Sequence, residues 1–268
     1  MTDSNNFIGR RNTSASERRI FMKKLTALLL AGAMAFACVG CGSSGGGDSD
    51  EKSEGVMTYD EYVAAELESE VVIETYVQAK QSWWDDTATV YSQDKDGAYF
   101  LYNMACSQDD YDKLTTGTKI KVTGYKSEWS GEVEIIDATF EIEDGNYVAE
   151  AEDVTSLLGT DDLINHQNEF VSFKGMTVEP AGQDESGNDV AYLYSWDGSG
   201  QDGDDLYFNV SLGGNVYTFT VESYLCDSST EVYAAVKNLN IGDKIDMEGF
   251  LYWYEGVNPH ITSVTAAN

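Results

Sequence analysis

The sequence has almost no basic residues beyond its first few dozen positions. All four arginines lie before residue 20, and from residue 42 onward ten lysines face 45 acidic residues, a formal charge of −35. A surface of that sign repels phosphate backbones and anionic lipid headgroups. We therefore expect no nucleic-acid partner and no polybasic attachment to membranes.

Histidine and cysteine are also scarce. His166 and His260 lie at no recognisable spacing from a serine or cysteine nucleophile, and the common hydrolase, metalloprotease and phosphate-loop motifs are missing. We therefore expect no enzyme, no catalytic residues and no cofactor. After residue 41 only Cys106 and Cys226 remain, without metal-ligand spacing. Both follow strand-like runs, and outside the cell they could pair as a disulfide or stay free.

The one long apolar run lies near the N-terminus. Met22-Lys-Lys is followed by the apolar run Leu25–Ala37 and then by Cys38-Val39-Gly40-Cys41. A basic start, a short apolar run and small residues at its end are typical of a secretory signal peptide. The run is shorter than the roughly 20 residues that a membrane-spanning helix needs.

The end of this run resembles the lipobox of bacterial lipoproteins. Gly40 occupies the small position before Cys41, whereas Cys38 stands where that family most often has leucine. The resemblance implies cleavage before Cys41, a diacylglyceryl group on its sulfur, and a membrane anchor that holds the protein on the outer face of the cell membrane. Plain secretion with cleavage elsewhere is the alternative.

Residues 1–41 are thus predicted to be a signal and lipobox segment. Translation starts at Met22, or else Arg18-Arg19 belongs to a twin-arginine export signal that replaces general secretion. Residues 42–56, rich in serine, glycine and acidic residues, are predicted to be a flexible tether.

The strongest internal signal is a repeat at a constant offset of 125 residues. Leu114–Tyr125 aligns without a gap on Leu239–Phe250, and the shared residues include two pairs of glycines: Gly117 with Gly242, and Gly124 with Gly249. The chain after the tether is therefore expected to hold two copies of one domain, at 57–148 and 149–268. The second copy carries an acidic, glycine-rich insertion at 182–205.

Each copy shows the pattern of three strands, a short helix and two further strands. That order, with glycines at the entry to the fourth strand, resembles the OB-fold. The fold is therefore predicted to be mainly β, with two tandem five-stranded OB-like barrels, each with a short helix between strands 3 and 4. Gly117 and Gly242 are expected at turns with positive φ, and Gly124 and Gly249 where the fourth strand bends.

The resemblance implies ligand binding through strands 2 and 3 and through the loops between strands 1–2 and 4–5. All five tryptophans lie in or beside such loops, and the candidate ligand-binding residues are Trp83, Trp84, Trp129, Trp196, Tyr252, Trp253 and Tyr254. Exposed rings can stack on a sugar, base or peptide. Neighbouring carboxylates favour a cationic or polyhydroxyl ligand. The alternative is that the rings plug the barrel ends.

The function predicted is that of a non-catalytic, lipid-anchored extracytoplasmic binding module for a glycan, a small molecule or a protein partner. The insertion holds seven carboxylates, which could ligate Ca²⁺, although their spacing fits no EF-hand and a solvated acidic loop is the simpler interpretation. The alternatives are a structural or assembly role in the cell envelope and, because the fold often serves it, nucleic-acid binding.

Overall fold

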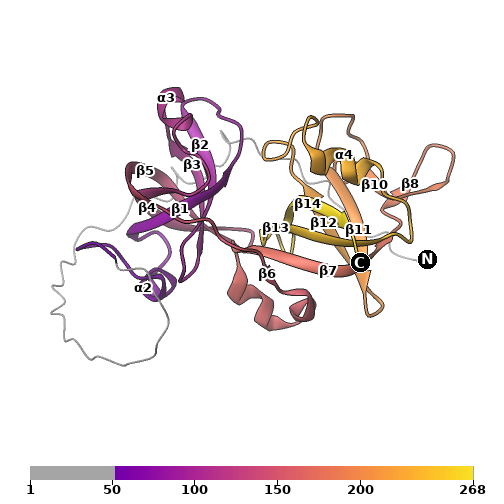
Figure 1. The fold of residues 1–268 in the computed structure, drawn as a ribbon, viewed down its shortest axis with the longest axis horizontal. Helices are drawn as coiled ribbons and strands as arrows, with labels where there is room; N and C mark the ends of the chain where they lie inside the picture. The colour runs from indigo at the N-terminus through magenta and orange to yellow at the C-terminus, as the bar shows by residue number, and fades with distance from the viewer. Residues whose placement is uncertain (1–51, 268) are drawn as a thin grey trace, which may run out of the picture. The chain divides into compact units, whose positions relative to one another are not determined.

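The computed structural model describes residues 52–267, which form two closed β-barrels in tandem (Figure 1). The predicted mainly-β fold with two five-stranded barrels is confirmed. The signal and lipobox segment, including Cys41, and residues 42–51 of the tether lie outside the described residues. Within 52–267, no helix has the length and apolar character needed to cross a bilayer.

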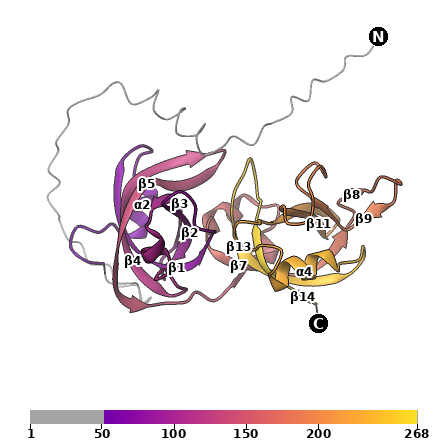
Figure 2. The same cartoon turned by 90° about the horizontal axis from the view of Figure 1, so that it is seen from above.

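The first barrel closes in the order β1-β2-β3-β5-β4, and its strands form a ring in Figure 2. Its elements are α2 (Tyr59–Ala64), β1 (Glu70–Lys80), β2 (Thr87–Gln93), β3 (Ala98–Ala105), α3 (Gln108–Tyr111), β4 (Thr118–Trp129) and β5 (Glu132–Asn146). Parallel pairing of β3 with β5 completes the ring. Alternate apolar residues such as Val71, Ile73 and Val122 fill the interior, so the barrel is a packed core.

The second barrel repeats this plan, with β7, β11, β12, β14 and β13 in its ring. Its elements are β7 (Phe170–Glu179), β11 (Leu206–Leu212), β12 (Asn215–Val221), α4 (Glu231–Lys237), β13 (Lys244–Phe250) and β14 (His260–Ala266). The ring closes because β7 pairs with both β11 and β13. As predicted, a short helix lies between the third and fourth strands of each barrel.

Short elements decorate the second barrel before and inside the predicted insertion. They are β6 (Glu152–Asp153), η1 (Thr155–Leu157), η2 (Asp161–His166), β8 (Gly182–Gln183), β9 (Asp189–Val190) and β10 (Tyr192–Tyr194). The strand β6 pairs with β7, β10 pairs with β11, and β8 and β9 form a separate hairpin. The insertion is therefore structured as strands and turns attached to the edge of β11.

The repeated glycines occupy equivalent places in the two barrels. Gly117 and Gly242 have φ of 90° and 93°, and their N–H groups donate to the carbonyl oxygens of Val77 and Val178 in the first strand of each barrel, at 2.7 and 2.8 Å. Only glycine adopts this backbone conformation without a steric cost. The duplication inferred from sequence spacing is thus a duplication of structure.

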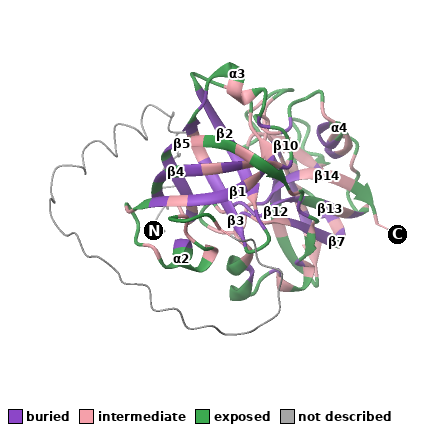
Figure 3. Cartoon of the chain, turned by 60° about the vertical axis from the view of Figure 1, so that its left-hand side comes forward, coloured by how far each residue is buried: buried purple, intermediate pink, exposed green. Residues whose placement is uncertain are grey.

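Burial shows that one outer face of the first barrel is covered. All seven residues of β2 are buried or half-buried, and so are the residues of β3 except its last (Figure 3). Tyr91 and Phe100 point out of this barrel and form a cluster with Phe250 and Tyr252 of the second barrel. The Tyr91 and Phe250 rings stack with centroids 4.6 Å apart. We call this contact the barrel joint.

Hydrogen bonds surround the barrel joint. The Tyr91 hydroxyl and His260 Nδ1 are hydrogen-bonded to each other at 2.6 Å, and both side chains are buried. The backbone N–H of Trp253 donates to the buried carboxylate of Glu132 at 2.8 Å, and that of Phe170 donates to Gln93 Oε1 at 2.8 Å. Buried polar groups with partners of this kind fix one relative arrangement of the residues that carry them.

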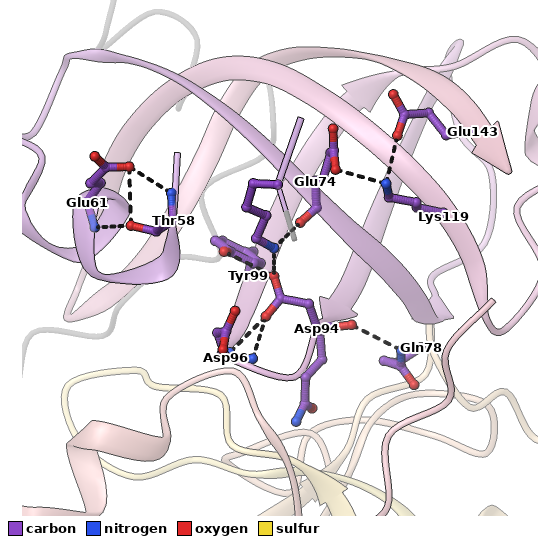
Figure 4. Close-up of polar contacts among 12 residues, drawn as sticks. Thr58, Glu61, Glu74, Gln78, Asp94, Asp96, Tyr99, Lys119 and Glu143 are labelled. Atoms are coloured by element: carbon purple, nitrogen blue, oxygen red, sulfur yellow. Dashed lines mark hydrogen bonds and ion pairs between the residues drawn. The ribbon is translucent and has the colours of Figure 1, made fainter. Parts of the chain in front are cut away.

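The last part of the predicted tether is held against the first barrel. Lys52 Nζ lies 2.5 Å from Asp94 Oδ2 and donates to the carbonyl oxygen of Glu74 at 3.1 Å. Asp94 also accepts the N–H groups of Asp96 and Gly97 in the β2–β3 turn (Figure 4). The tether is thereby joined to a fixed point of the barrel.

Two further details concern the end of β13 and the two cysteines. The strand β13 ends at Phe250, and Tyr252 beyond it packs into the barrel joint. Of the two alternatives open for Cys106 and Cys226, the structure has free thiols, each buried in the core of a different barrel.

The close packing of Gly249 leads to a testable prediction. A Cβ there would lie 2.3 Å from the carbonyl oxygen of His260 and 2.7 Å from Ile261 Cα, both backbone atoms. We expect Gly249→Ala to lower the free energy of unfolding by about 1–3 kcal/mol, measured by urea denaturation. Gly182→Ala serves as control, because its φ is not positive and a Cβ there would meet only the flexible side chain of Leu193, at 3.1 Å. Equal losses for the two variants would contradict this packing.

His260 gives the barrel joint a pH dependence. Burial lowers the pKa of His260 to about 3, so the folded protein holds a neutral imidazole where the unfolded chain protonates near pH 6.5. Its stabilising contribution is present above pH 6.5 and is lost as the pH falls toward 3. Relative to His260→Gln, wild type should lose about 2 kcal/mol of unfolding free energy between pH 7 and pH 5. A pH-independent difference would mean that water reaches His260.

Candidate functional site

The barrel joint divides the candidate aromatic residues into two groups. Tyr252 is buried in the joint, and Trp253 is half-buried with its ring beside Gly131 of the β4–β5 turn. The backbone N–H of Glu255 donates to the carbonyl oxygen of Ser130 in that same turn, at 2.7 Å. Tyr252 and Trp253 therefore lie where the two barrels meet.

A two-residue turn places Trp84 in solvent. Trp84 and Thr87 exchange both backbone hydrogen bonds, and Asp85 and Asp86 between them have positive φ of 49° and 57°. Tight hairpins use this conformation, which aspartate tolerates better than most residues. The neighbouring Trp83 is half-buried, and its Nε1 donates to the carbonyl oxygen of Cys106 at 3.0 Å. Of these two neighbouring tryptophans, Trp84 is the exposed one, with 75% of its surface accessible to solvent.

Tyr224 of the second barrel is held beside the strand that leads to Trp84. The backbone N–H and the hydroxyl of Ser82 donate to the carbonyl oxygen of Tyr224 at 2.8 and 3.2 Å. Tyr224 is 67% exposed. Two exposed aromatic residues, Trp84 and Tyr224, thus come from segments of the chain that are hydrogen-bonded to each other through Ser82, at the edge of the barrel joint.

Two carboxylates lie beside the backbone around Tyr224. Glu222 accepts the backbone N–H groups of Tyr224 and Leu225 and the side-chain amide of Gln81, at 3.1, 2.9 and 3.1 Å. Asp205 accepts the N–H and hydroxyl of Ser223. We call Trp84, Tyr224, Glu222 and Asp205 together the seam surface. It combines stacking rings with hydrogen-bond acceptors.

One carboxylate of the seam surface, Glu222, has an unusually high pKa. Burial, and then the charge of Asp205, raise the pKa of Glu222 to about 7. Burial, with Asp205 and Glu222 nearby, also raises the pKa of Tyr207 on β11 to about 12. Glu222 therefore changes between hydrogen-bond donor and acceptor near neutral pH, while Tyr207 stays a neutral phenol.

The other candidate aromatics lie elsewhere. Trp129 is half-buried at the last position of β4, opposite Glu132, and Trp196 is 54% exposed in the insertion after β10. Tyr254 is 40% exposed in the loop between β13 and β14. The structure therefore does not gather the seven candidates into one site, and of these Trp84 alone belongs to the seam surface.

Three carboxylates of the acidic insertion have hydrogen-bond or ion-pair partners in the protein. Asp184 accepts from Asn188 and Ser186, Asp197 accepts from Ser199, and Asp202 pairs with Lys237 Nζ at 2.6 Å. Among residues 52–267, metal-ligand atoms gather in a different group, Glu152, His166 and Glu169. None of the insertion carboxylates suggested as Ca²⁺ ligands belongs to that group.

Sequence reasoning missed Tyr224, Glu222 and the group around His166, and it considered Asp205 only as one of the carboxylates of the insertion. Tyr224 and Glu222 follow β12 directly, and no motif distinguishes them from the other tyrosines and carboxylates of the chain. The spacing His166-x-x-Glu169 was a usable signal, because a tight turn brings residues three apart onto one side.

Comparisons with known proteins give likenesses in structure alone. No protein-family model matches the chain, and no curated protein matches it. A murine DNA-binding protein bound with dsDNA is similar over 74% of this chain and 96% of that one, at 10% identity and a TM-score of 0.35. The Ifi202 HINa domain in complex with 20-bp dsDNA is similar over 75% of this chain and 100% of that one, at 12% identity and a TM-score of 0.33. A replication protein A heterotrimer bound to ssDNA is similar over 74% of this chain and 49% of that one, at 13% identity and a TM-score of 0.29.

The expectation that nucleic acid is excluded as a partner is contradicted by these comparisons. Structures similar to this chain have been solved with bound dsDNA and with bound ssDNA. The exclusion relied on the formal charge of the whole chain, which fixes the average potential and not the chemistry of one surface.

Proposed function

We propose that the chain is a non-catalytic binding module whose ligand stacks on the seam surface, and that this ligand is a polyhydroxyl one such as a cell-wall glycan. The hydrogen bonds from Ser82 to the carbonyl oxygen of Tyr224 carry the proposal. They join the segment that holds the exposed Trp84 to the segment that holds the exposed Tyr224.

The chemistry beside the rings favours hydroxyl groups. Asp205 and Glu222 lie beside Tyr224, and Asp85 and Asp86 follow Trp84 directly in the chain. Carboxylates accept hydrogen bonds from sugar hydroxyls, while the apolar face of a sugar ring packs on an aromatic side chain. A polyhydroxyl ligand gains both interactions without a phosphate on every unit, which the acidic surface would repel.

Nucleic acid is the second candidate, and the solved structures similar to this chain suggest it. Bases stack on aromatic rings much as sugars do. Because carboxylates flank the rings of the seam surface, phosphates would approach them with a bridging divalent cation. Binding of this kind predicts a strict dependence on Mg²⁺ or Ca²⁺, which a glycan would not share.

A lipid on Cys41 would keep the module at the membrane. Cys41 and Lys52 are eleven residues apart, a distance of about 40 Å when the chain is extended. Because Lys52 is pinned to Asp94, the first barrel would stay within that distance of the bilayer. This is a suitable range for a ligand in the cell wall.

Titration with defined ligands tests the proposal. Muropeptides, oligo-dT and a 20-bp duplex are titrated against the protein by calorimetry, with and without Mg²⁺. We expect muropeptide binding without Mg²⁺, and we expect Trp84→Ala and Tyr224→Ala each to weaken it by about fivefold or more.

Trp196→Ala is the matched control, because it removes an exposed tryptophan outside the seam surface. Loss of muropeptide binding in this variant alone would move the site to the insertion. Mg²⁺-dependent binding of DNA without muropeptide binding would replace the glycan with nucleic acid.

A further inference from the structure

Three potential metal ligands converge in the segment that connects the barrels. Glu152 lies in β6, His166 ends η2, and Glu169 precedes β7. His166 Nδ1 lies 2.8 Å from Glu169 Oε2 and 3.7 Å from Glu152 Oε2. The three ligand atoms all lie within 4.8 Å of one another. We call this group the linker triad.

Backbone structure brings the linker triad together. Parallel pairing of β6 with β7 sets Glu152 opposite Val171, two residues after Glu169. The N–H of Glu169 donates to the carbonyl oxygen of His166 at 3.0 Å, closing a turn in which Asn168 has φ of 70°. The ligands therefore come from a turn and an adjacent strand, both fixed by backbone hydrogen bonds.

The donor set selects a class of metal ion. One imidazole nitrogen and two carboxylate oxygens suit a borderline divalent ion such as Zn²⁺, whereas Ca²⁺ prefers oxygen ligands throughout. Around a tetrahedral zinc ion, ligand atoms lie about 3.4 Å apart. The distances in the triad bracket this value, so small side-chain rotations suffice. Half-exposure of His166 and Glu169 and exposure of Glu152 leave access for the ion.

The two residues between the ligands hold the first barrel. Gln167 Nε2 donates to the carbonyl oxygen of Gly131 at 2.8 Å, and Asn168 Nδ2 donates to that of Val133 at 3.1 Å. On the other side, Asn168 N–H donates to the Leu251 carbonyl oxygen, and Leu251 N–H donates to that of Glu169. A ligand that fixed His166 and Glu169 would therefore fix the residues that join the barrels.

We propose that Glu152, His166 and Glu169 form a binding site for a divalent transition-metal ion such as Zn²⁺, and that the bound ion stiffens the barrel joint through Gln167 and Asn168. The competing explanation is a simple ion pair between His166 and Glu169, which needs no metal. The two explanations differ in what added zinc does.

Zinc titration of the metal-free full chain tests the site. Calorimetry at pH 7.5 should show one zinc site, and His166→Gln and Glu169→Gln should each weaken it by more than about tenfold. Asp161→Asn is the matched control, because it removes an exposed carboxylate of η2 outside the triad. Zinc affinity that is unchanged in His166→Gln would overturn the proposal, since binding would then belong to surface carboxylates. Circular dichroism establishes that each variant is folded.

Hydrogen exchange tests the mechanical part. Zinc should slow exchange of the amides of Asn168, Glu169 and Leu251, and this protection should be lost in His166→Gln. Zinc binding at the triad without added protection would overturn the proposed effect on the barrel joint. The readout does not involve the seam surface or its ligand, so failure of the proposed function leaves it intact.

Discussion

Aromatic packing on the outer face of β2 and β3 is the constraint on which the rest of the structure depends. Tyr91 and Phe100 point away from the core of their own barrel and meet Phe250 and Tyr252, with ring centroids 4.6 and 5.2 Å apart in the Tyr91–Phe250 and Phe100–Tyr252 pairs. Such pairs contribute roughly 0.5–1.5 kcal/mol each beyond the burial of their area. His260 is buried at the same contact, and its hydrogen bond with the hydroxyl of Tyr91 replaces one that water would make.

This packing makes two similar barrels unequal. In OB-folds the face of strands 2 and 3 is the usual ligand surface, and in the first barrel the second barrel covers it. A ligand there would be flanked by the loop that contains Trp83 and Trp84 and by the β4–β5 turn. Their free parts now lie at the edge of the joint, where Ser82 meets Tyr224. The seam surface is thus a consequence of the joint and belongs to neither barrel alone.

The sequence predicted the barrels well because their signals are local or repeated. The glycines at 117 and 242 share one backbone conformation, and α3 and α4 lie between the third and fourth strands as predicted. The joint escaped prediction because an outward aromatic such as Tyr91 or Phe100 has the same pattern whether it meets a ligand or another domain. The continuous apolar run Ala98–Tyr102 was a usable sign that β3 is covered on both faces. The contact of Trp253 with Gly131 escaped prediction for the same reason.

Cross-relaxation between aromatic rings in solution tests the joint most directly. In protein with selectively labelled tyrosine and phenylalanine, the stacked rings of Tyr91 and Phe250, 4.6 Å apart at their centroids, should give strong nuclear Overhauser effects. Substitution of Tyr91 by leucine identifies the signals. Absence of any effect between these rings in the folded protein would show that the face of β2 and β3 is open, and the seam surface would then have no basis.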